Sequence, residues 1–236
     1  MSEPHATHGA SAAKWLAVAE CAAVTAVYVL IAFGGLRLID VSSALDWLAP
    51  EEAQVVSGFI AGAISQIVAV ALIWLLFRPV DLARSFAAIR TPSRAEGWFI
   101  ALTIIGVETV VMYSFILDTG WRAIEPSAIN LSGSIAPLLD GVTQEVFFRG
   151  YLIFRLSRGG HGLFAQVLVS SLAFSVIHIG YVGQSWGDAL PPLLGTLGLG
   201  VGLGWAMIRG GHSLKAPILA HAAILVIVQP WLALAR

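Results

Sequence analysis

Residues 53–77 read AQVVSGFIAGAISQIVAVALIWLLF and contain no charged side chain. A helix of about 20 mostly apolar residues is long enough to cross the hydrocarbon core of a bilayer. Backbone polar groups in lipid must bond within their own segment, so such a stretch has to be helical. Residues 53–77 therefore predict a transmembrane helix, and the rest of the chain can be compared with them.

The composition of the whole chain agrees with a lipid environment. Of the 236 residues, 58% are hydrophobic and 11% are charged, whereas soluble domains carry roughly 25% charged residues. The expected fold class is all-α, a polytopic integral membrane helix bundle with about seven transmembrane helices. The predicted spans are 14–36, 53–77, 97–117, 135–154, 163–179, 190–208 and 216–234. The polar residues 1–13 are predicted as a disordered N-terminal arm.

Positive charges gather in alternate connections between the predicted spans. By the positive-inside rule these connections are cytoplasmic, which places the N-terminus in the cytoplasm and the C-terminus outside. The connections follow the second, fourth and sixth spans and hold Arg78, Arg84, Arg90 and Arg94, then Arg155 and Arg158, then Arg209 and Lys215.

Charge and cysteine content exclude several classes of protein. A net charge of −1 offers no basic field for nucleic acid. A single cysteine, Cys21, rules out an intrachain disulfide and a multi-cysteine metal site. The expected partners are membrane lipids and a membrane-associated peptide or protein.

Ionisable residues inside the spans are costly, and they mark candidate functional positions. They are Glu20, Glu108, Asp140, Glu145, Arg149, His178 and His221. Glu145 and Arg149 are four residues apart, share one helix face and can form an ion pair. We interpret Glu20 and Glu108 as structural residues that bond neighbouring helices in their protonated form.

His178 and His221 lie on different predicted spans, and Phe174 shares a helix face with His178. Two imidazoles and one carboxylate can position a water for attack on a carbonyl, or they can hold a divalent metal such as zinc. The depth of His178 in the membrane does not match that of His221 and Glu145. His178 follows Arg158 by twenty residues, about 30 Å of continuous helix, which would place it near the far side. Either this helix starts well after Arg158 or a bent segment brings His178 back, and Gly159, Gly160 and Gly162 favour a non-helical start.

Three stretches together resemble the motifs of the CAAX proteases and bacteriocin-processing enzymes, the Abi family. Gln144-Glu145-Val146-Phe147-Phe148-Arg149 resembles Glu-Glu-x-x-x-Arg, and Phe174-x-x-x-His178 resembles the second motif. His221 is similar to the start of the third motif, His-x-x-x-Asn/Asp. On this resemblance, residues 14–133 are N-terminal transmembrane helices and residues 134–229 are the protease-like core.

The resemblance implies an intramembrane endopeptidase that hydrolyses a peptide bond of a membrane-associated peptide or protein. Bacterial members take part in bacteriocin maturation and immunity, so the expected location is the bacterial cytoplasmic (inner) membrane. In the family the first glutamate activates a water, the two histidines and the Asn/Asp position it and stabilise the oxyanion, and the arginine supports the first motif. The implied catalytic positions are Gln144, Glu145, Arg149, His178 and His221, with His178 and His221 as the metal ligands if a metal takes part.

The sequence departs from the family at Gln144, where the water-activating glutamate is expected, and at Leu225, where Asn or Asp is expected. Glutamine cannot accept a proton as a base. Three interpretations are open: an engineered Glu-to-Gln change that leaves an inactive protease, a natural pseudoprotease for peptide binding or bacteriocin immunity, and a site in which Glu145 is the base. The last needs a helix rotation, because adjacent positions point about 100° apart. A small membrane transporter is a further alternative.

Overall fold

The computed structural model describes residues 5–36, 38–77, 79–119, 135, 138–178 and 186–234. This part of the chain is helical and contains no strand, which confirms the all-α class. The helices are α1 (His5–Leu36), the short η1 (Ser42–Ala44), α2 (Pro50–Phe77), α3 (Val80–Arg90), α4 (Ala95–Thr119), the π-helix η2 (Glu145–Leu152), α6 (Ile153–Arg158), α7 (Leu163–Val176), α8 (Trp186–Arg209) and α9 (Lys215–Leu234). Residues 138–144 are also helical and run directly into η2.

A helix occurs at each of the seven predicted apolar stretches. Two of the described helices are long and apolar enough to cross a membrane, namely Ser11–Ala32 within α1 and Pro50–Phe77. Shorter apolar helices are Leu163–Val176, Leu193–Arg209 and Lys215–Ile227. Large apolar side chains on α4, such as Phe99 and Leu102, face outward, as they do on helices in contact with lipid. The chain is therefore a membrane protein by length and composition, and the number of seven spans stays a prediction.

Two elements differ from the sequence-based expectation. Helix α1 begins at His5 rather than at Lys14, so it covers most of the predicted disordered arm. The alanines of this segment are the strongest helix formers, which allows the apolar helix to continue toward the N-terminus. Helix α3 forms within the arginine-rich connection after α2.

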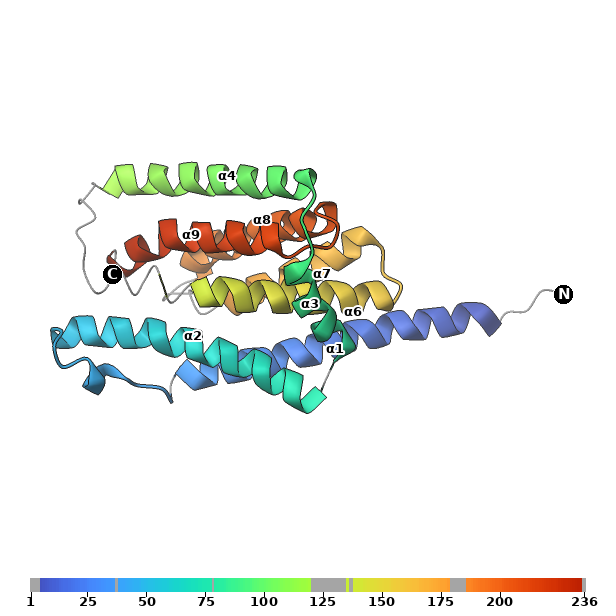
Figure 1. Cartoon of the computed structure of the whole chain (residues 1–236), viewed down its shortest axis with the longest axis horizontal. Helices are drawn as coiled ribbons and strands as arrows, with labels where there is room; N and C mark the ends of the chain where they lie inside the picture. The colour runs from blue at the N-terminus through green and yellow to red at the C-terminus, as the bar shows by residue number, and fades with distance from the viewer. Residues whose placement is uncertain are drawn as a thin grey trace.

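The long helices lie roughly side by side, with η2 and α6 in the middle of the bundle (Figure 1). Helices α1 and α2 pack together at one edge, and α4 packs on α8 and α9 at the opposite edge. The main core cluster contains the large apolar side chains of η2 together with Tyr28 of α1, Ile73 of α2 and Phe174 of α7. The helix that carries the first motif is therefore enclosed by the other helices.

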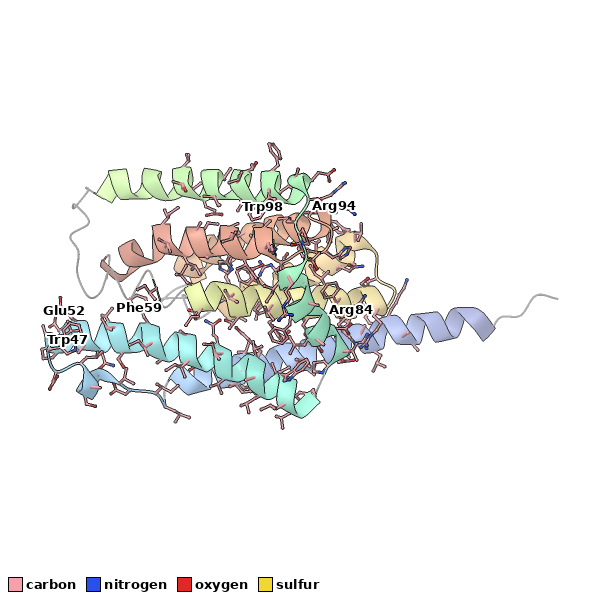
Figure 2. All side chains as sticks on the ribbon, in the orientation of Figure 1. Trp47, Glu52, Phe59, Arg84, Arg94 and Trp98 are labelled. Atoms are coloured by element: carbon pink, nitrogen blue, oxygen red, sulfur yellow. The ribbon has the colours of Figure 1, made fainter. Side chains whose placement is uncertain are left out.

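The three cationic connections contact one another at one end of the bundle. The backbone N–H of Arg94 donates to the carbonyl of Gly210 over 3.1 Å. The Ser213 hydroxyl donates to the Thr91 carbonyl over 2.7 Å. Figure 2 shows Arg84 and Arg94 toward this end, and Trp47 and Glu52 toward the other. The predicted cytoplasmic connections thus share one end, and the termini lie at opposite ends of the bundle (Figure 1).

Asp81 of α3 joins two of these connections. Its side chain is fully buried and lies 2.8 Å from the guanidinium of Arg158, the last residue of α6. Burial raises the pKa of Asp81, although the charges of Arg158, Arg155 and Arg84 act in the opposite direction. The carboxyl group therefore fastens α3 to the end of the central helix.

Candidate functional site

The π-helix η2 is the centre of the candidate site, and all of its residues are buried. The Ser170 hydroxyl of α7 donates to the Phe148 carbonyl over 2.6 Å, so a backbone acceptor of η2 is bonded from outside the helix. Gly150 allows α3 to approach, because a Cβ at this position would overlap the side chain of Ser85. π-Helices are rare and often occur at functional sites. Here one carries Glu145 and Arg149.

Glu145, Arg149 and His221 form a buried charged group. Nδ1 of His221 lies 2.8 Å from Oε1 of Glu145. Nη1 of Arg149 lies 3.1 Å from the same oxygen, and both side chains of this pair are fully buried. The predicted ion pair between Glu145 and Arg149 is thus present, and it includes an imidazole from α9. The second carboxylate oxygen, Oε2, is buried and has no hydrogen-bond partner among the described residues.

Phe174 brings the arginine and both histidines around one ring. The guanidinium carbon of Arg149 lies 4.0 Å from the centroid of the Phe174 ring. The imidazole of His178 lies 4.6 Å from that centroid, and the imidazole of His221 lies 5.5 Å from it. Arg149, His178 and His221 therefore meet around a single fully buried aromatic residue.

The depth of His178 is explained by the start of its helix. Helix α7 begins at Leu163, after the turn that follows Arg158, and it ends at Val176. His178 follows in a 3₁₀ turn, with Nδ1 2.8 Å from the carbonyl oxygen of Phe174. The late helix start expected from the glycines is therefore confirmed.

The two imidazoles have the same ring nitrogen protonated. A carbonyl oxygen and a carboxylate oxygen only accept hydrogen bonds, so Nδ1 of His178 and Nδ1 of His221 each carry a hydrogen. In the neutral ring the lone pair is then on Nε2. In each neutral ring these Nδ1 contacts make Nε2 the nitrogen that accepts a proton.

Gln144 faces a different set of neighbours. Its Nε2 donates to Oε1 of Gln66 on α2 over 2.9 Å. The hydroxyl of Tyr28 on α1 donates to the same Gln66 oxygen over 2.8 Å. Oε1 of Gln144 is buried without a hydrogen-bond partner among the described residues. Glu145 thus contacts α9, whereas the adjacent Gln144 contacts α2.

Gln66 and Tyr28 were missed by the sequence analysis. The search for costly residues inside the spans considered ionisable groups only, whereas Gln66 is a neutral amide and Tyr28 a phenol. The signal was present, because an amide in the middle of an otherwise apolar span needs a hydrogen-bond partner in lipid. A search that included amides would have found Gln66.

The other intramembrane acids have separate positions. Glu20 accepts from Arg155 of α6 over 2.8 Å. The predicted contact of Glu20 with a neighbouring helix is therefore confirmed, and its partner is the guanidinium of Arg155. Glu108 is half-buried on α4, and Asp140 is half-buried one turn before Gln144.

Leu225 makes an apolar contact at the position where the family has Asn or Asp. Its Cδ1 would lie 3.4 Å from a Cβ placed on Gly141, one turn before Glu145. Helix α9 therefore packs closely on the helix that leads into the site. A leucine at this position supplies packing and no hydrogen bond.

The described side chains do not fit a metal centre. They contain no group of three or more His, Cys, Asp or Glu residues that could hold one ion. The nearest carboxylate, Glu145, is already shared by His221 and Arg149. We therefore derive no chemical step that uses a metal.

The comparison with protein families agrees with the arrangement of the motifs. Residues 126–227 match the family model described as type II CAAX prenyl endopeptidase Rce1-like. No curated protein matches the chain, and no solved structure matches it. The match contains the site residues of η2, α7 and α9, and it excludes α1 and α2.

Proposed function

We propose that the chain hydrolyses a peptide bond of a membrane-associated substrate, from the premise that residues 126–227 match the family model of type II CAAX prenyl endopeptidases, Rce1-like. In the proposed site His221 is the general base and Glu145 orients it. The observation that carries the proposal is the distance of 2.8 Å between Nδ1 of His221 and Oε1 of Glu145.

This pair has the chemistry of a carboxylate–histidine dyad. A buried carboxylate that accepts from Nδ1–H fixes the tautomer of the imidazole and stabilises the imidazolium that forms when Nε2 takes a proton. Arg149 lies 3.1 Å from the same carboxylate oxygen and places a positive charge beside it. The dyad therefore supplies a base without a glutamate at position 144.

The reaction can be written in two proton transfers. Nε2 of His221 takes a proton from a water, and the water oxygen attacks the carbonyl carbon of the peptide bond. The carbon–nitrogen bond then breaks, and the leaving amine takes the proton back from the imidazolium. His178, which contacts the same Phe174 ring, is the group that positions the water. The imidazolium and Arg149 supply positive charge where the oxyanion develops in a low-dielectric site.

The proposed location is a bacterial cytoplasmic membrane with the N-terminus in the cytoplasm. The three cationic connections share one end of the bundle, as the positive-inside rule requires of cytoplasmic loops. The substrate is then a peptide that reaches the site within the apolar bundle. Bacteriocin processing is one such reaction, and it follows from the resemblance of the motifs alone.

A peptide-binding pseudoprotease, including one that acts in bacteriocin immunity, is the second candidate. Two observations favour it: the amide of Gln144 cannot act as a base, and Leu225 makes only an apolar contact. Such a protein would hold a peptide in the same place and leave it intact.

Four forms of the chain in lipid nanodiscs separate these candidates: the parent chain, Gln144→Glu, Glu145→Gln, and the double variant. Each is assayed for cleavage of a prenylated CAAX peptide. If the dyad is the base, the parent cleaves, Gln144→Glu changes the rate little, and Glu145→Gln lowers kcat by up to about 10⁴ because the imidazole tautomer is lost.

A rise of about 10²–10⁴ on Gln144→Glu would instead assign the base to position 144 and contradict the dyad. That outcome would also mean that the present chain is the inactive Glu-to-Gln form. Binding without cleavage by all four forms would favour the pseudoprotease.

A further inference from the structure

We propose that Gln66 and Tyr28 are positioning residues that fix the amide of Gln144, and that the Gln144 carbonyl accepts a hydrogen bond from a backbone N–H of the bound peptide. This inference rests on the proposed function only in that a peptide occupies the site. It assigns a role to α1 and α2, which lie outside the family match.

The direction of the Gln144 amide follows from its contacts. Oε1 of Gln66 accepts from Nε2 of Gln144 over 2.9 Å and from the Tyr28 hydroxyl over 2.8 Å. One N–H of the Gln144 amide is donated to Gln66, and the acceptor atom of the amide is Oε1. That atom is buried and unpaired among the described residues, in a side chain that is only 7% exposed.

The positioning groups are themselves held firmly. The Tyr28 ring stacks on Phe147 of η2 with the ring centroids 4.5 Å apart. It also meets the edge of Phe148, with centroids 5.5 Å apart. Tyr28 is fully buried, so its hydroxyl reaches Gln66 from a fixed ring. Helices α1 and α2 thus fix the orientation of a residue next to the dyad.

The chemistry of a peptide in lipid matches this acceptor. A peptide that leaves water loses the partners of its backbone N–H groups, and each unpaired group in an apolar environment is costly. A buried amide oxygen without a donor carries the complementary cost. One hydrogen bond between them removes both costs, and a neutral amide provides it without a second carboxylate beside Glu145.

The first test examines the amide of Gln144 directly. In nanodiscs, the ¹⁵N side-chain amide resonance of Gln144 is assigned as the signal that disappears in Gln144→Glu. The same resonance is then measured in Gln66→Met, Gln66→Glu and Gln54→Met. Gln54 is exposed on the same helix and is the matched control. Glutamate keeps the acceptor that Gln144 needs, whereas methionine fills similar space without one. We expect the resonance to move in Gln66→Met and to stay hydrogen-bonded in Gln66→Glu.

The second test measures the binding and cleavage of a fluorescent prenylated CAAX peptide by the same variants. Gln66→Met should raise Kd or KM about tenfold with little change in kcat, and Gln66→Glu should restore most of the affinity. If Gln66 only fills space, the order reverses, because methionine packs well and a buried charge does not. That reversed order would overturn the inference.

A third test identifies the peptide group. Peptides in which one backbone amide at a time is replaced by an ester lose a single N–H. At one backbone position the ester should weaken binding of the peptide to the parent chain about tenfold. The same ester should leave binding to Gln144→Met unchanged, because a double-mutant cycle shows this pattern when the two groups contact each other directly. Equal losses in both proteins at every position would contradict the inference.

Failure of the two proposals can be told apart. If the binding pattern holds while no form cleaves the peptide, the inference stands and the proposed hydrolysis fails. If cleavage occurs but Gln66→Met behaves like Gln54→Met, the hydrolysis stands and the inference fails. A parent chain that does not bind the peptide contradicts both.

Discussion

Gln144 and Glu145 are adjacent residues, yet they belong to two different sides of the site. On the charged side, Glu145, Arg149 and His221 meet around Phe174 between η2, α7 and α9. On the neutral side, Gln144, Gln66 and Tyr28 share hydrogen bonds between the same helix, α2 and α1. The charged side comes entirely from the family-matched segment, whereas two of the three residues of the neutral side lie outside it.

The difference between the two sides is one of energy as well as of origin. Removing one partner of a buried ion pair leaves an uncompensated charge, which costs about 3–5 kcal/mol. Removing one partner of a neutral buried hydrogen bond costs about 1–3 kcal/mol. Substitutions on the charged side should therefore have the larger effects, and the following predictions rank accordingly.

Arg149→Met should give the largest loss of stability, about 3–5 kcal/mol, because it leaves the buried Glu145 carboxylate without its counter-charge. The matched variant Arg149→Met/Glu145→Gln removes both charges and should be less destabilised. Unfolding of the two variants in detergent by denaturant measures the difference. If the single variant is as stable as the double one, the pair does not compensate charge.

His221→Asn should lower kcat by about 10²–10⁴, since it removes the proposed base while keeping a polar side chain. His161→Asn is the matched control, because His161 lies in the turn before α7 and its imidazole contacts the carbonyl of Lys14, away from the site. Peptide cleavage by the two variants tests the assignment. Equal activity of both would remove His221 from the reaction.

Phe174→Leu should destabilise the chain by about 2 kcal/mol or more, because a desolvated cation–π contact with Arg149 is lost. Phe99→Leu on α4 is the matched control, since Phe99 is 73% exposed. Thermal unfolding of both variants in detergent gives the comparison. The same loss in both would show that the ring does not hold Arg149.

Tyr28→Phe should cost about 1 kcal/mol, because it removes the hydroxyl donor to Gln66 and keeps the ring stacked on Phe147. Tyr151→Phe is the matched control, since its hydroxyl is 3.5 Å from Glu20, at the limit of a hydrogen bond. Peptide affinity should fall for Tyr28→Phe and stay unchanged for the control. An affinity loss confined to Tyr151→Phe would contradict the role of the Tyr28 hydroxyl on the neutral side.

Asp81→Asn lies outside both sides and should have the smallest effect. Burial raises the pKa of Asp81 above its ordinary value of 3.8, so the folded state binds the proton more tightly. The tighter proton binding adds to the free energy of unfolding. This contribution is fully present below about pH 3.8 and is lost as the pH rises through the pKa of Asp81 in the folded state. Between about pH 4 and about pH 7 the melting temperature should therefore fall less in Asp81→Asn than in the parent.

Asp40→Asn supplies a control of opposite sign. Hydrogen bonds from Ser42 and Ser57 lower the pKa of Asp40, so its contribution is present at neutral pH and is lost as the pH falls through the folded pKa. A parallel pH response of the Asp81 and Asp40 variants would contradict one of the two assignments.

The apolar stretches were enough to predict most helices, because lipid leaves the backbone few alternatives. The motif residues were also enough to predict that Glu145 meets His221, and that His178 lies near them at the ring of Phe174. Helix α3 was missed because it is a short amphipathic helix within a charged connection, where no long apolar run marks it.

The orientation of Gln144 and Glu145 could not be predicted from spacing. The family resemblance assigns the first motif position to the reaction, whereas the structure turns the second position, Glu145, toward His221. That choice depends on the hydrogen-bond pattern of η2 and on Gln66, which lies far away in the sequence. Neither the pattern of a helix nor a partner on another helix is visible in a local motif.

The eight-residue π-helix has a consequence for the evolution of this chain. Each wide turn accommodates one residue more than an α-helical turn, so the segment acts like a one-residue insertion that the neighbouring helices have accepted. A residue inserted into an α-helix turns everything before it by about 100°, whereas π-turns hold the extra residue and spare the flanking helix most of that rotation. The π-helix therefore lets Gln144 and Glu145 keep their separate neighbours. One codon gained in this segment leaves unchanged which of the two residues meets His221.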